Sequence, residues 1–255
     1  MSSLVGKKTR RARRANMNRQ VTLGLVTLAC AAVFGLAGPA AADGIAMSYR
    51  YASLGEVSTV YHQPTRPLFG METKPTTGDV SSKWQAVEAE IEQEKIVLAH
   101  CRTQQACPAA ARALLDIVAE GADRTGRARV GWINRAVNLA IIPTSDEAQW
   151  GVADRWSAPF ETLQTHRGDC EDYAIVKYVA LLEAGVSQGD LKIVILRNFV
   201  RNEDHAVLAA RVDGEWLILG NNSLALVRDS DMIGAKPIFV LDQDGAHRLI
   251  ATARG

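Results

Sequence analysis

The chain has 255 residues, 47% of them hydrophobic and 22% charged, so it is long enough to bury one sizeable core. Seven of its 29 basic residues lie in residues 1–42, which contain no acidic residue, and residues 43–255 carry 22 basic against 28 acidic residues. A mildly acidic body without a basic stripe gives no reason to expect nucleic-acid binding.

The first 42 residues have the three parts of a secretory signal peptide. A basic start is followed by an apolar stretch over residues 21–36 and then by small residues that end in Ala40-Ala41-Ala42. This order predicts export, with cleavage before Asp43. An uncleaved membrane anchor is the alternative, but the apolar stretch is short for a membrane span. We therefore expect a periplasmic protein.

Residues 43–80 are rich in turn-forming residues and lack sustained periodicity, so we expect an irregular N-terminal arm that lies over a single domain of residues 81–255. The stretch Ser82-Lys83-Trp84-Gln85 fits a capping box and predicts the start of the first helix. Four apolar residues then recur at helical spacing, namely Trp84, Val87, Ile91 and Leu98.

Two further helices and a change of texture follow. We expect a second helix from Pro108 to about Gly121 and a third over residues 127–141, before Pro143. The stretch "CEDYAIVKYVALLEAG" is predicted to form a helix that ends at Gly185.

The rest of the chain reads as strands. Four short apolar and β-branched segments predict strands over residues 191–196, 205–212, 215–220 and 237–242. Asp213-Gly214 is a strong signal for a two-residue hairpin between the middle two. Helices followed by an antiparallel sheet indicate an α+β fold.

The cysteines read differently once export is assumed. Cys30 lies inside the predicted signal peptide, and Cys101 and Cys107 bracket a loop short enough for a disulfide in an oxidising compartment. Two free thiols are the alternative. Cys170 is left without a partner, and an unpaired cysteine in an exported protein is a candidate reactive thiol.

Cys170 has an unusual setting, because Asp169, Glu171 and Asp172 surround it with negative charge that disfavours a thiolate. If Asp169 is the N-cap, Cys170 lies in the first helical turn, where the helix dipole and free N–H groups lower a thiol pKa. A nucleophilic cysteine also needs a base, and His205 opens the strand "HAVLAARV". The alternative is an inert, buried structural cysteine.

Three stretches together resemble the bacterial transglutaminase-like cysteine peptidases over roughly residues 80–240. They are "WSAPFET" at 156–162, "GDCEDYAIVKYVALLEAG" at 168–185 and "DHAVLAARVDGEWLIL" at 204–219, and "INRAVN" at 133–138 also fits. The resemblance implies a papain/transglutaminase-like fold in which the cysteine helix packs on the antiparallel sheet. It also implies a Cys–His–Asp triad, carried here onto Cys170 and His205, and a Ca²⁺ site on the acids beside the cysteine.

The best-known type of this family is a periplasmic protease of a biofilm-adhesin system. The resemblance therefore implies a protein substrate in the cell envelope, such as a surface adhesin, and an inner-membrane receptor that sequesters the protease.

A calcium ion would offset the charges around Cys170. The expected ligands are Asp169, Glu171 and Asp172, and a set of oxygen ligands alone suits Ca²⁺ better than zinc. Residues two apart diverge on a helix, so Asp169 must lie outside it to share an ion with Glu171, whereas Asp169 and Asp172 face together more easily. The alternative is acids that merely complement the helix dipole.

The third triad member is where the chain departs from its family. Gly220 stands where the family has aspartate, in the segment "LGNN" at 219–222. With Asp213-Gly214 as the turn, opposed residue numbers sum to 427, so His205 faces Asn222 and shares one face of the hairpin with it. We expect Asn222 to orient the histidine, as an asparagine does in papain-like enzymes.

Three functions remain open on these residues. The first is an active exported cysteine peptidase. The second is a catalytically impaired relative that binds a peptide through the same cleft, as the glycine at position 220 suggests. The third is an acyl transferase that passes the acyl group to an amine instead of water.

Overall fold

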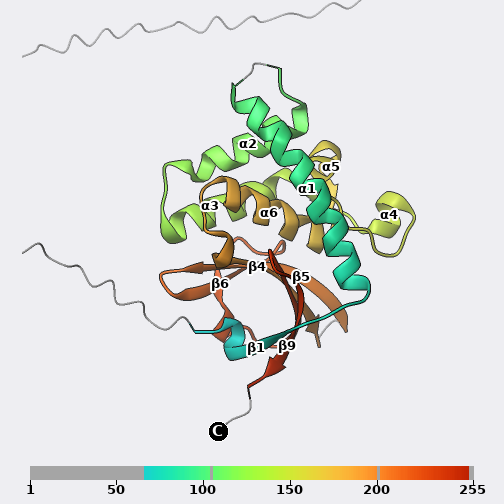
Figure 1. Ribbon diagram of the computed structural model, residues 1–255, viewed down its shortest axis with the longest axis vertical. Coiled ribbons are helices and arrows are strands. Elements are labelled where there is room, and N and C mark those ends of the chain that lie inside the picture. Colours follow the sequence, from blue (N-terminus) through green and yellow to red (C-terminus); the bar gives the residue numbers. More distant parts are fainter. Residues whose placement is uncertain (1–65, 104–105, 200–201, 253–255) are drawn as a thin grey trace, which may run out of the picture. The chain divides into compact units, whose positions relative to one another are not determined.

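The structure is a computed structural model that describes residues 66–103, 106–199 and 202–252 (Figure 1). Its α-helices are α1 (Asp79–Thr103), α2 (Ala109–Ala122), α3 (Gly126–Ala140), α4 (Asp146–Trp150), α5 (Pro159–Thr165) and α6 (Cys170–Glu183). Short 3₁₀ turns are η1 (Leu68–Gly70), η2 (Gln188–Asp190) and η3 (Asp229–Asp231).

Within these residues, one sheet has the strand order β1-β9-β8-β4-β5-β6-β7, and its neighbouring strands are antiparallel. The strands are β1 (Met71–Pro75), β4 (Leu191–Asn198), β5 (Glu203–Val212), β6 (Glu215–Leu219), β7 (Val227–Arg228), β8 (Ala235–Asp242) and β9 (Gly245–Ala251). A separate parallel pair joins β2 (Ile142–Pro143) to β3 (Arg167–Gly168). The predicted α+β class is confirmed.

Helix α6 is the centre of the main core. In Figure 1, α2, α3 and α6 gather on one side of the sheet, and α6 contacts β4 and β5. Residues 171–181 of α6 are all buried, as expected for a helix covered on every side. Side chains of β5 alternate, so that Ala206 and Leu208 pack toward the helices while Val207 packs into a second cluster on the other face.

The first helix differs from the prediction at its start. α1 begins at Asp79, so Ser82 lies inside the helix, where its hydroxyl donates to the Gly78 carbonyl at 3.2 Å. The predicted capping box is therefore wrong, because the chain already enters the helix one turn earlier. The four predicted core residues of this helix, Trp84, Val87, Ile91 and Leu98, are all buried.

Part of the predicted irregular arm is regular. Met71–Pro75 forms the edge strand β1 and pairs with β9, which the sequence did not predict either. Four of the five β1 residues are exposed, so the segment carries little of the apolar alternation that marks a strand.

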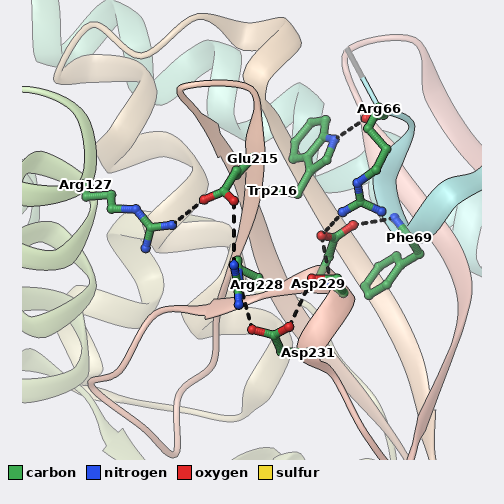
Figure 2. Close-up of polar contacts among 9 residues, drawn as sticks. Arg66, Phe69, Arg127, Glu215, Trp216, Arg228, Asp229 and Asp231 are labelled. Atoms are coloured by element: carbon green, nitrogen blue, oxygen red, sulfur yellow. Dashed lines mark hydrogen bonds and ion pairs between the residues drawn. The ribbon is translucent and has the colours of Figure 1, made fainter. Parts of the chain in front are cut away.

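A buried carboxylate ties the segment before β1 to the sheet (Figure 2). Asp229 is 3% exposed, pairs with the Arg66 guanidinium and accepts the backbone N–H of Phe69 at 2.6 Å. The Trp216 indole donates to the Arg66 carbonyl at 3.1 Å. These contacts hold the start of the described chain against the face of the sheet opposite the helices.

The predicted disulfide between Cys101 and Cys107 is confirmed. The predicted signal peptide, its cleavage before Asp43 and most of the arm lie outside the described residues. Among the residues that the structure does describe, no helix is long and apolar enough to span a membrane.

Candidate active site

The predicted nucleophile opens the central helix. α6 begins at Cys170, and Asp169 is its N-cap residue, as the sequence predicts. Among the described residues, Cys170 is the one cysteine outside a disulfide, and it is half-buried. Its sulfur accepts the backbone N–H of Ala206 at 3.3 Å, and its thiol donates to Glu171 Oε2 at 3.1 Å.

The predicted base lies beside it. His205 directly precedes Ala206 on β5, and the Ala206 contact therefore brings the start of this strand to the thiol. Cys170 and His205 line one cleft of about 550 Å³ between α6 and β5. Its other walls include Lys83 on α1, Trp156 in the loop that follows α4, and Phe239 on β8.

The hairpin that carries the third position has the predicted register but is shorter than expected. Opposed residues run from Val212–Glu215 to Leu208–Leu219, and the turn residues Asp213 and Gly214 have φ values of 52° and 80°. Both values are left-handed, as a type I′ turn requires. β6 ends at Leu219, so the ladder does not extend to a pair between His205 and Asn222.

His205 and Asn222 nevertheless line one cavity. This second cavity of about 320 Å³ is also lined by Val207 and Gly220. A Cβ atom added to Gly220 would lie 3.0 Å from Asn222 Oδ1. The amide of Asn222 therefore occupies space next to the point where a side chain on residue 220 would begin.

Three carboxylates converge next to the thiol. Ligand atoms of Asp146, Asp169 and Glu171 all lie within 4.8 Å of one another. Asp146, at the start of α4, is 2% exposed and was missed by the sequence analysis. Nothing near it in the sequence marks it as a ligand, because its place beside Asp169 results from the long-range pairing of β2 with β3.

The third acid predicted as a ligand lies outside this group. Asp172 is fully buried, and its Oδ1 accepts the backbone N–H of Ser157 at 2.9 Å. Its Oδ2 packs against Gly168, where an added Cβ would come within 2.6 Å of that oxygen. In this position Asp172 ties the loop before α5 to α6.

The charges of the site oppose a thiolate. Burial, followed by the negative charge of Glu171, raises the pKa of the Cys170 thiol, while the Ala206 N–H acts in the opposite direction. Burial also raises the pKa of Asp169, and burial together with the nearby Asp169 carboxyl raises that of Glu171. The site as described therefore favours the Cys170 thiol over its thiolate, and the thiol donates to Glu171.

The carboxylate group fits a calcium ion. Asp169 Oδ1 is buried and has no hydrogen-bond partner among the described residues, as expected of an atom placed to bind a cation. Lys83 lines the cleft, but its amine pairs with Asp79 and Asp154. The donors are carboxylate oxygens alone, which Ca²⁺ prefers.

The model of the bacterial transglutaminase-like cysteine proteinase family matches residues 96–232, more than half of the chain. The chain therefore belongs to this family, and it is a transglutaminase-like cysteine peptidase by class, as the sequence resemblance predicts. A search of curated protein sequences gives no match.

Solved structures share the fold. LapG of Legionella pneumophila is 21% identical, with a TM-score of 0.50 over 61% of this chain and 87% of LapG. Its calcium-bound form gives 23% identity and a TM-score of 0.51 over 64% of this chain and 90% of that one. The EGTA-treated form is 22% identical, with a TM-score of 0.50 over 61% of this chain and 84% of that one.

Proposed function

We propose that the protein is an exported cysteine peptidase that hydrolyses a peptide bond in a cell-envelope protein. The observation that carries this proposal is the meeting of Cys170 with the start of β5, through the 3.3 Å contact between the Ala206 N–H and the sulfur. That contact brings a cysteine at a helix N-terminus into one cleft with His205. Family membership supports the same chemistry.

In the proposed mechanism His205 accepts the thiol proton and the Cys170 thiolate attacks the peptide carbonyl carbon. The N–H groups of the first turn of α6 favour negative charge at this position. His205 then donates the proton to the leaving amine, and the acyl group remains on the sulfur as a thioester. A water molecule, deprotonated by His205, attacks the thioester, so that the carboxylic acid leaves and the thiol is restored. Asn222 orients His205 through these steps.

We further propose that Asp146, Asp169 and Glu171 bind Ca²⁺. Bound there, the ion supplies positive charge beside Cys170 that offsets the carboxylates. Glu171 would then be a calcium ligand in place of accepting the hydrogen bond of the Cys170 thiol. A structure named calcium-bound LapG supports this assignment by likeness of fold.

The location and the partners rest on the sequence. The order of charges and apolar residues in residues 1–42 supports export to the periplasm. The family resemblance supports an envelope protein, such as a surface adhesin, as the substrate. It also supports an inner-membrane receptor that sequesters the protease.

One observation favours a second candidate, a catalytically impaired relative that binds a peptide in the cleft. Gly220 offers no side chain at the position of the family's acid. Incubation with cell-envelope proteins, with calcium or a chelator and with Cys170→Ala as the control, separates the candidates. Hydrolysis yields new carboxyl ends, and an acyl transferase yields amides when a primary amine is added. The impaired relative yields neither and retains only binding.

A further inference from the structure

The segment after β6 leaves the sheet but is held on both sides of Asn222. Asn138 Nδ2 on α3 donates to the Gly220 carbonyl at 3.1 Å and to the Ser223 carbonyl at 3.0 Å. Lys177 Nζ on α6 donates to the same Gly220 carbonyl at 2.9 Å. Asn134, one turn before Asn138, lies 3.4 Å from the Ser223 carbonyl through its own Nδ2. We call Asn138 and Lys177 the clamp.

The clamp lies where strand pairing stops. The β5–β6 ladder ends at Leu219, and the Gly220 carbonyl is therefore bound by side chains in place of a strand. Buried backbone carbonyls need such partners, because an unpaired one costs as much as a lost hydrogen bond. Asn138 binds the carbonyls of Gly220 and Ser223, which flank Asn221 and Asn222 in the chain. Fixing both leaves the backbone of Asn222 little freedom to turn away from the second cavity.

Lys177 also connects the clamp to the nucleophile. It lies seven residues after Cys170, about two helical turns, and therefore on the same side of α6. Its side chain is fully buried, and burial lowers its pKa to about 7. A lysine at a buried position costs stability relative to an apolar residue, so packing alone does not account for it. Its amine instead reaches the residue at the family's acid position.

We propose that Asn138 and Lys177 are positioning residues that hold Asn222 beside His205 and so set the reactivity of Cys170. This inference rests on the proposed function, in which Asn222 orients His205. In the family pattern an aspartate at position 220 would lie on the clamped residue itself. In this chain the clamp binds the Gly220 carbonyl and acts through the backbone on Asn222, two residues further along.

The test uses iodoacetamide, from which the Cys170 thiolate displaces iodide, so no protein substrate is required. Alkylation rates are measured from pH 5 to 9 in calcium-containing buffer for the wild type, Asn138→Ala, Asn222→Ala and the double variant. We expect Asn138→Ala and Asn222→Ala each to lower the rate near neutral pH by about 5- to 10-fold, with no further loss in the double variant. Non-additivity of this kind indicates that Asn138 acts through Asn222.

One control, one reserve variant and His205→Ala are measured in the same way. Ile117→Val on α2 lowers stability away from both cavities, and we expect it to leave the alkylation profile unchanged. Lys177→Met removes the second donor to the Gly220 carbonyl and repeats the cycle if Asn138→Ala folds poorly. If Asn138→Ala lowers the alkylation rate by the same factor in the Asn222→Ala background as in the wild type, the clamp is overturned. The same holds if Asn138→Ala alone keeps the wild-type profile. If His205→Ala has the same alkylation profile as the wild type, the proposed function is overturned, and the clamp with it.

Discussion

An acidic side chain restored at position 220 should raise the reactivity of the site. Gly220→Asp is sterically possible, since the nearest obstacle to the new Cβ is Asn222 Oδ1 at 3.0 Å. Asn222 is exposed, so its side chain can turn aside. The substituted residue also keeps its backbone carbonyl, and the contacts from Asn138 and Lys177 can persist.

The size of the gain follows from the charge that an amide lacks. A carboxylate about 4 Å from an imidazolium gains about 4 kcal/mol at an effective dielectric constant of about 20. The position is half-buried, and Asn222 already orients the ring in our account, so only part of this energy is new. A gain of about 1.4–2.8 kcal/mol corresponds to about a 10- to 100-fold increase in rate.

The assay compares Gly220→Asp with Gly220→Asn, which has nearly the same shape but no charge. Rates of peptide-bond cleavage and of Cys170 alkylation are measured at pH 7 for both variants, with melting temperatures as the check on folding. Equal rates for two folded variants would refute the electrostatic reasoning. If Gly220→Asp cleaves and the wild type does not, the natural protein is the impaired binding module.

Three further outcomes are expected. Chelation of calcium should lower the melting temperature, because an ion that binds only the folded state stabilises it by about 2.7 kcal/mol when its free concentration is about 100 times its Kd. Asp146→Asn should have the same effect as chelation. If elemental analysis finds no calcium in the purified protein and a chelator changes nothing, the calcium site is contradicted. Burial raises the pKa of Glu94 to about 7, so its folded-state pKa exceeds the unfolded value and the stability of the protein falls as pH rises from about 4.5 to 7. Glu94→Gln should therefore be more stable than the wild type by about 1–3 kcal/mol at pH 8 and no more stable at pH 4.5. Denaturant unfolding at both pH values checks this, with exposed Glu120→Gln on α2 as the matched control. N-terminal sequencing of the protein recovered from a periplasmic extract should give a first residue near Asp43, and an intact Met1 in the membrane fraction would contradict export.

The start of α6 at Cys170 and the hairpin register could be predicted because their signals are local. Cys170 directly follows an N-cap residue at the start of a largely apolar helical segment, and α6 begins where that segment begins. Asp213-Gly214 favours a type I′ turn, which fixes every opposed pair of β5 and β6 as far as Leu219. Both predictions depend on only a few neighbouring residues.

The missed features depend on contacts between distant parts of the chain. Asp146 joins the carboxylate group because Thr144 and Gly168 hydrogen bond across the short pair β2–β3, which is too short to show periodicity. The ladder ends at Leu219, where side chains of α3 and α6 bind the Gly220 carbonyl instead. No sequence pattern around Gly220 records those partners.

The most direct test of a Cys170–His205 peptidase is to count new protein N termini by mass spectrometry. Purified cell-envelope proteins are incubated in calcium-containing buffer with the wild type, Cys170→Ala or His205→Ala, and the free amines that appear are identified. Our account predicts a small set of new N termini with the wild type and none with either variant. The same termini with Cys170→Ala, or no new termini with a folded, calcium-loaded wild type, would contradict it.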